Sequence, residues 1–168
     1  MDESQRKHER AVGEAFVDWY NSERGTKFDF DGRPHEAPDL LYRHGNEALQ
    51  IEVGQAYYDE RDAAFKWKGA RGDPNAPKDW HGVNFNDALI QHVSKIIVDK
   101  CTKRYGSNCV LVVNVYPDAS TIDEINARFG EVEIPRSHPF AGIYLTGHFG
   151  KDILHPSRPS GYRCWKLA

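Results

Sequence analysis

The sequence predicts an α/β protein that folds as a three-layer sandwich, with a mixed β-sheet flanked by helices. Segments with helical spacing of apolar residues are interspersed with short strand-like segments, and residues 109–117 form a nearly continuous apolar run. Such a run is typical of a strand buried on both faces of a sheet. Because 168 residues are enough for one core but not for two ordinary domains, we expect a single domain over residues 1–168.

Composition limits the class of protein further. Hydrophobic residues make up 39% of the chain and charged residues 28%, and a net charge of -3 is not that of a dedicated polyanion binder. No apolar run approaches the length of a membrane-spanning helix and the charged N-terminus has no signal-peptide pattern, so we expect a cytoplasmic protein. Three cysteines without CxxC spacing and eight histidines without zinc-site spacing indicate reduced thiols and scattered surface histidines.

The first predicted element is an amphipathic helix over residues 4–22. Val12 and Phe16 recur on one side at helical spacing, and the polar, glycine-containing segment 21–27 ends the pattern. Glu9 lies one turn before Val12 on the same apolar side. It is therefore a candidate site residue, and the alternative is an acid that only interacts with the positive end of the helix dipole.

Three strands and a long connection are predicted next. Residues 27–31 alternate like a short strand, and residues 39–43 and 48–55 form the two arms of a hairpin. Residues 59–85 then form a connection in which aromatic and basic side chains stand together, the basic ones being Lys66, Lys68 and Arg71. Such a segment can contact bases and phosphates at the mouth of a site, or it can be a solvated amphipathic helix.

The strongest helix pattern covers residues 86–106. Asn86 is the expected N-cap of this helix and Gly106 its stop signal. The apolar run comes directly after it and is the expected central strand. The remaining predicted elements are a helix over about 120–129 and strands within 141–149 and 161–167.

The turn of the hairpin fixes the expected pairing of its two arms. Gly45 and Asn46 are the residues most tolerant of positive φ, and a turn centred between them makes the numbers of cross-strand partners sum to 91. Asp39 then faces Glu52, and Gln50 shares their side of the hairpin. The other side is apolar and consists of Leu40, Tyr42, Leu49, Ile51 and Val53.

Two carboxylates placed directly opposite each other destabilise a sheet unless their charge is compensated. A divalent cation is the natural compensation, and oxygen ligands of this kind favour Mg2+ or Mn2+ over Zn2+. The alternative is an ordinary hairpin with one exposed acid in each arm and no cation.

These features resemble those of the PD-(D/E)XK nuclease superfamily, which includes many restriction endonucleases. The resemblance rests on Asp39 after Pro38, the hairpin, the acid in the "IEV" strand, and the order of helices and strands over about residues 5–117. It implies a restriction endonuclease-like core in which Asp39 and Glu52 bind Mg2+ or Mn2+, with Glu9 as a candidate third acid. The implied substrate is nucleic acid, DNA first and RNA as the alternative, and a homodimer is expected where both strands are cut.

The chain departs from the family at one position. The family places a lysine that helps to activate the attacking water two residues after the acid, where this chain has Gly54. Lys100 is a candidate replacement because it falls within the apolar stripe of the long helix, and Lys66 and Lys68 are others. Gln50 can hold a water or a phosphate oxygen. The alternatives are a snorkelling Lys100 and a plain polar Gln50.

Three functions stay open at this point. The first is a metal-dependent nuclease that uses Asp39 and Glu52. The second is a catalytically inactive nuclease-like domain that binds nucleic acid or protein, which Gly54 favours. The third is an unrelated α/β domain, in which the two acids have nothing to do with each other.

Overall fold

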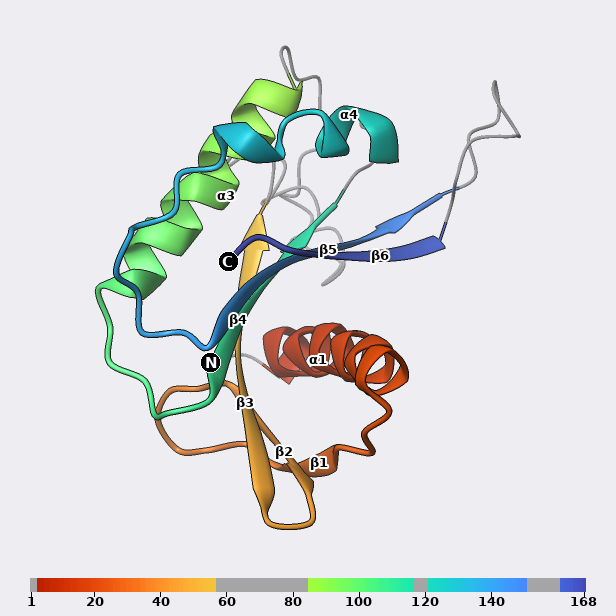
Figure 1. Ribbon diagram of the computed structural model, residues 1–168, viewed down its shortest axis with the longest axis vertical. Coiled ribbons are helices and arrows are strands. Elements are labelled where there is room, and N and C mark those ends of the chain that lie inside the picture. The colour runs from red at the N-terminus through yellow and green to blue at the C-terminus, as the bar shows by residue number, and fades with distance from the viewer. Residues whose placement is uncertain (1–2, 57–84, 117–120, 151–160) are drawn as a thin grey trace.

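The computed structural model describes residues 3–56, 85–116, 121–150 and 161–168 of the chain (Figure 1). Its centre is a six-stranded sheet in the order β1-β2-β3-β4-β5-β6. β3, β4 and β5 are parallel to one another, and the outer pairs are antiparallel. The prediction of an α/β protein with a mixed sheet is confirmed. The strands are β1 (Asp29–Gly32), β2 (Leu40–His44), β3 (Glu47–Ala56), β4 (Cys109–Val115), β5 (Gly142–Phe149) and β6 (Gly161–Lys166).

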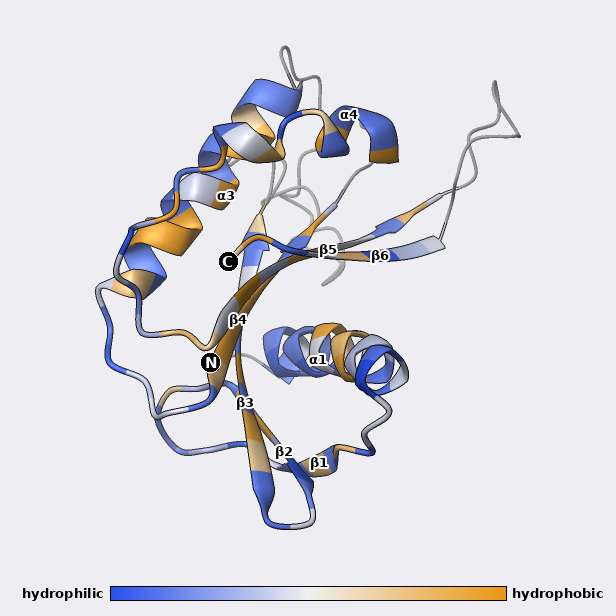
Figure 2. Ribbon diagram, viewed as in Figure 1, coloured by the Kyte–Doolittle hydropathy of each residue, from blue (hydrophilic) through white to orange (hydrophobic). Residues whose placement is uncertain are grey.

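Helices pack on both faces of this sheet. α1 (Glu3–Arg24) lies on one face and α3 (Phe85–Cys101) on the other (Figure 1). The central strand β4 shows the division, because Val112 belongs to the core on the α1 face and Val113 to the core on the α3 face. Figure 2 shows hydrophobic residues along the central strands and hydrophilic ones at the turn between β2 and β3. The predicted double burial of the apolar run is confirmed.

The predicted ends of the long helix are wrong. α3 begins at Phe85 and ends at Cys101, so Asn86 is not its N-cap and Gly106 is not its stop signal. After Cys101 the backbone N–H of Lys103 donates to the carbonyl of Lys100 at 3.2 Å and closes a turn. Tyr105 then packs its ring against Phe140, with centroids 4.7 Å apart. This tertiary contact draws the chain away from the helix axis although residues 102–105 are compatible with a helix.

The predicted helix near residue 125 is also shorter than expected. α4 covers Ile122–Asn126 and is followed by a 3-10 turn, η1 (Phe129–Glu131). Its start is well defined by a capping box, in which Thr121 and Glu124 satisfy each other's backbone N–H groups.

The predicted register of the hairpin is confirmed. Leu40 pairs with Ile51 and His44 with Glu47, so the turn consists of Gly45 and Asn46. The expected apolar side packs under α1 in one buried cluster, and its hairpin members are Leu40, Tyr42, Leu49, Ile51 and Val53. Asp39 directly precedes β2, and the same register places it opposite Glu52.

Two further expectations concern the rest of the chain. Lys66, Lys68 and Arg71 lie outside the described residues. Among the helices that the structure describes, none combines the length and hydropathy required to span a membrane.

Candidate functional site

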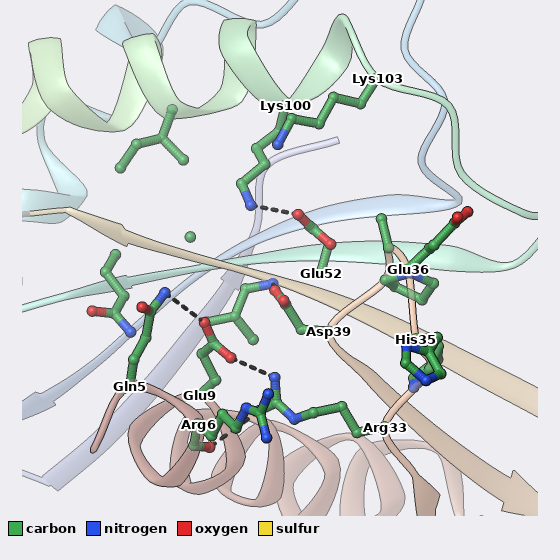
Figure 3. A pocket seen from close by; sticks show the side chains of 17 residues that line it. Gln5, Arg6, Glu9, Arg33, His35, Glu36, Asp39, Glu52, Lys100 and Lys103 are labelled. Atoms are coloured by element: carbon green, nitrogen blue, oxygen red, sulfur yellow. Dashed lines mark hydrogen bonds and ion pairs between the residues drawn. The ribbon is translucent and has the colours of Figure 1, made fainter. Parts of the chain in front are cut away.

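A pocket of about 560 Å³ lies beside the second half of β3. β2 accompanies β3 only as far as Ile51, whereas β3 continues to Ala56. The space beside the last residues of β3 is bordered by the start of α1, the link over 33–39 and the end of α3 (Figure 3). Both Asp39 and Glu52 line it, so the structure brings the two predicted acids into one pocket.

Asp39 is anchored to the backbone of β3. Its Oδ2 accepts a hydrogen bond of 2.9 Å from the backbone N–H of Val53. Burial raises the pKa of Asp39 to about 6, the charge of Glu52 raises it as well, and the hydrogen bond from Val53 opposes the rise. The N–H and the C=O of one strand residue point to the same side, so the carbonyl of Val53 points towards the Asp39 side of β3. The Asp39 carboxylate and the Val53 carbonyl therefore lie at the same edge of β3.

Glu52 points to the α3 face and is only 3% exposed. Its Oε1 forms an ion pair with Nζ of Lys100, which reaches down from the last turn of α3 (Figure 3). Its Oε2 is buried and makes no hydrogen bond of good geometry among the described residues, although a side-chain interaction of Glu52 with Tyr105 contributes to the raised pKa of Tyr105. A buried carboxylate oxygen without such a hydrogen bond is costly, and here it lies in a residue that borders the pocket.

The close approach of α3 to Gly54 explains why this chain has no lysine two residues after Glu52. A Cβ at position 54 would lie 2.6 Å from Cγ2 of Ile96 on α3. The helix therefore excludes a side chain there, and one turn further on the same helix supplies Lys100. The structure brings this predicted replacement to Glu52.

Glu9 enters the same pocket from α1 but is held by other groups. It is 4% exposed, and its two oxygens accept hydrogen bonds from Gln5 Nε2 at 3.0 Å and Arg33 Nη1 at 2.7 Å. The charge of Glu9 also contributes to the raised pKa of Asp39, which burial dominates. Within the described ranges, no group of three or more His, Cys, Asp or Glu side chains is placed to hold a metal ion. In this arrangement Glu9 faces Arg33 rather than a shared cation.

Gln50 shares the face of Glu52, as predicted, but it does not line the pocket. Its side chain packs against Gly106, where an added Cβ would lie 2.9 Å from the amide oxygen. Tyr105 and Cys109 are also close to Glu52: burial first, and the charge of Glu52 second, raise the pKa of both. Gln50 thus lies next to Gly106, outside the pocket that Glu52 lines.

Several pocket residues were not predicted from the sequence. They include Gln5, Arg6, Arg33, His35, Glu36 and Lys103. The turn-rich link that ends at Asp39 was the available signal, since a link without regular structure directly before a site acid can carry site residues. For Lys103 the available signal was its position three residues after Lys100, since such residues lie on the same side of a helix.

Comparisons with protein-family models, with curated proteins and with solved structures find no match for this chain. The geometry of the pocket is therefore the basis for a functional proposal.

Proposed function

We propose that this protein is a divalent-metal-dependent nuclease that hydrolyses phosphodiester bonds of DNA or RNA, on a three-layer core of restriction endonuclease type. One observation carries the proposal. Asp39, Glu52 and Lys100 come from a link, a strand and a helix, and they meet in one pocket with the lysine on the acid. The combination of two carboxylates and one amine is the one that the PD-(D/E)XK resemblance implies.

The side chains at the pocket suit Mg2+ or Mn2+. Their donors are hard oxygen atoms from Asp39 and Glu52, and the Val53 carbonyl lies on the same side of β3. The buried Oε2 of Glu52, which makes no hydrogen bond of good geometry among the described residues, and the raised pKa of Asp39, which burial and the charge of Glu52 cause, both indicate negative charge that the protein does not fully compensate. A divalent cation bound there would polarise a phosphoryl oxygen and lower the pKa of a water molecule.

The chain's own groups have distinct tasks in this proposal. The hydrogen bond from Val53 fixes the Asp39 carboxylate at the edge of β3. Lys100 holds positive charge beside Glu52, where charge develops on the phosphate oxygens during hydrolysis. α1 and the link over 33–39 form the opposite wall and limit how a phosphodiester can enter.

A second candidate function is nucleic-acid binding without turnover. It is favoured by the ion pairs of the pocket, since Lys100 already compensates Glu52 and Arg33 already compensates Glu9. If Lys100 stays on Glu52, the remaining charge can be too small to recruit a catalytic cation.

A cleavage assay separates these functions. Single- and double-stranded DNA and RNA are incubated with the protein in Mg2+, Mn2+ or EDTA. We expect metal-dependent cleavage that Asp39→Asn or Glu52→Gln lowers by at least about 100-fold, and that Lys100→Met lowers by about 10²–10³-fold, as removal of a charge-stabilising group does elsewhere. Glu47→Gln on β3 and Lys95→Met on α3 are matched controls at exposed positions and keep full activity.

Calorimetric titration with Mn2+ completes the test. The nuclease proposal expects binding that is lost in Glu52→Gln and kept in Glu47→Gln. Nucleic-acid binding with no cleavage in either metal would support the second candidate. Cleavage that persists in both Asp39→Asn and Glu52→Gln would exclude the pocket as the active site.

A further inference from the structure

Three hydrogen bonds hold the ion pair between Glu9 and Arg33 at the pocket. Arg33 Nη1 donates to Glu9 Oε2 at 2.7 Å, and Arg33 Nη2 donates to the carbonyl of Arg6 at 3.1 Å. Gln5 Nε2 donates to the other oxygen of Glu9 at 3.0 Å. Hydrogen bonds at both ends of the guanidinium plane fix its orientation, which a single contact would not do.

The two partners differ in exposure. The Glu9 side chain is 5% exposed and the Arg33 side chain 23% exposed, and both line the pocket. The carboxylate is therefore the buried member, and the guanidinium is the member that solvent or a ligand can reach. Such an arrangement holds an arginine in place for an anion that approaches its solvent-accessible side, because little side-chain freedom remains to be lost on binding.

The pair formed by Glu9 and Arg33 lies across the two acids from Lys100 (Figure 3). Figure 3 shows Lys100 on one side of Asp39 and Glu52, and Arg33 with Glu9 on the other side. Arg6 lines the same wall as Arg33, and Lys103 lines the wall of Lys100. The carboxylates thus lie between two basic walls. A nucleic-acid strand whose scissile phosphate is at Asp39 and Glu52 brings a neighbouring phosphate towards one of these walls.

We infer that Arg33 binds a backbone phosphate of the nucleic acid next to the scissile one, and that Glu9 is the positioning residue that holds Arg33 for this contact. The inference rests on the proposed function, since it concerns the same pocket and the same class of ligand. It assigns to Glu9 a task different from that of a third metal ligand. It also accounts for a buried carboxylate whose two oxygens are held by Gln5 and Arg33.

The test measures binding of a short fluorescent single-stranded oligodeoxynucleotide by anisotropy, in EDTA so that no turnover occurs, over a series of salt concentrations. Arg33→Gln is expected to weaken binding about tenfold and to reduce the slope of log affinity against log salt by about 0.7, the value for one phosphate of a single strand that is no longer neutralised. Arg33→Lys keeps the charge without the fork geometry and gives an intermediate decrease in affinity. Arg43→Gln, which removes an exposed arginine paired with Asp31 outside the pocket, changes neither quantity.

Glu9→Gln separates positioning from metal binding. It is expected to weaken oligonucleotide binding, and Glu9→Gln combined with Arg33→Gln is expected to be no weaker than Arg33→Gln alone. The affinity for Mn2+ should stay within about twofold of that of the unchanged protein, whereas removal of a metal ligand would change this affinity far more. Circular dichroism melts confirm that each variant is folded at the assay temperature.

Each outcome decides a separate point. An unchanged salt slope in Arg33→Gln, or a loss of Mn2+ affinity in Glu9→Gln equal to that in Glu52→Gln, overturns the inference. Binding through Arg33 without cleavage in any divalent metal supports the inference and removes the nuclease proposal. If the oligonucleotide does not bind the unchanged protein, the inference is overturned together with nucleic-acid binding.

Discussion

The two halves of β3 differ in the strands that pair with them. Residues 47–51, the paired half, pair with β2, and only Gln50 and Ile51 among them also pair with β4. Residues 52–56, the open half, pair with β4 alone, and residues 52–55 border the pocket where β2 is no longer present. In the paired half, Leu49 and Ile51 are buried under α1, whereas Ala48 and Gln50 on the other side are half-buried. The open half instead contains Glu52, which is buried, and Gly54, whose α3 face is closed by Ile96.

One strand thus combines stabilising packing with a buried carboxylate at the edge of a pocket. The paired half fixes the register against β2 through packing and hairpin geometry, and the open half continues it, with Val53 in the same buried cluster. A buried carboxylate such as Glu52 destabilises a fold by itself, so it needs a strand that is held by other residues. The predictions below test the two halves separately.

The largest expected effect lies in the paired half. Leu49 is 1% exposed in the cluster under α1, so Leu49→Ala should lower the free energy of unfolding by about 2 to 5 kcal/mol, as truncations of buried leucine do. Urea unfolding followed by circular dichroism measures this change. The affinity of the folded variant for Mn2+ should be unchanged, because the open half keeps its contacts. Arg43→Gln, at an exposed position on β2, is the control and should stay within about 0.5 kcal/mol.

A smaller effect is expected from Gly54→Ala in the open half. The added Cβ would meet Cγ2 of Ile96 at 2.6 Å, and overpacking of this kind costs about 1 to 3 kcal/mol. Unfolding of Gly54→Ala, Ile96→Ala and the double variant gives the coupling between the two positions. The double variant should be more stable than the sum of the single changes implies, since removal of Cγ2 makes room for the new methyl. Strict additivity would show that α3 does not close this position.

The halves also differ in how far the sequence determines them. The Gly45-Asn46 turn and the apolar alternation are local signals, and together they were enough to predict the pairing of Leu40 with Ile51 and the opposition of Asp39 to Glu52. Lys100 was predictable as a site residue because helical periodicity places it on the face that packs against the sheet. These features depend on periods and turns that can be read over a few residues.

Features that depend on tertiary contacts could not be predicted in the same way. Arg33 lies in a link with no periodicity, and its partner Glu9 is 24 residues away in the chain, so nothing local indicates that they meet. The early end of α3 follows from the packing of Tyr105 on Phe140, which overrides helix propensity. Position 54 can be understood only with Ile96 in place, because the sequence shows a missing lysine but not the side chain that excludes it.

The smallest expected effect concerns the charge of Asp39. Its pKa is raised to about 6, by burial first and then by Glu52, so the folded state binds a proton more tightly than the unfolded chain does. The contribution of Asp39 to stability should therefore fall as pH rises from about 4 to 6, and this loss should be complete above that range. The shift corresponds to at most about 3 kcal/mol, and about 1 to 2 kcal/mol is expected because Asp39 borders an open pocket.

Asp39→Asn removes this charge and should raise the free energy of unfolding at pH 8 while changing it little at pH 4. Thermal melts at both pH values measure the difference, with Asp29→Asn on β1 as the control at an exposed position. Saturating Mn2+ should reverse the order at pH 8, since a cation that binds only the folded protein stabilises the chain that keeps its carboxylate. A lower stability of Asp39→Asn at pH 8 without metal would contradict this prediction. It would mean that the hydrogen bond from Val53 to the Asp39 carboxylate stabilises the fold by more than the buried charge of Asp39 destabilises it.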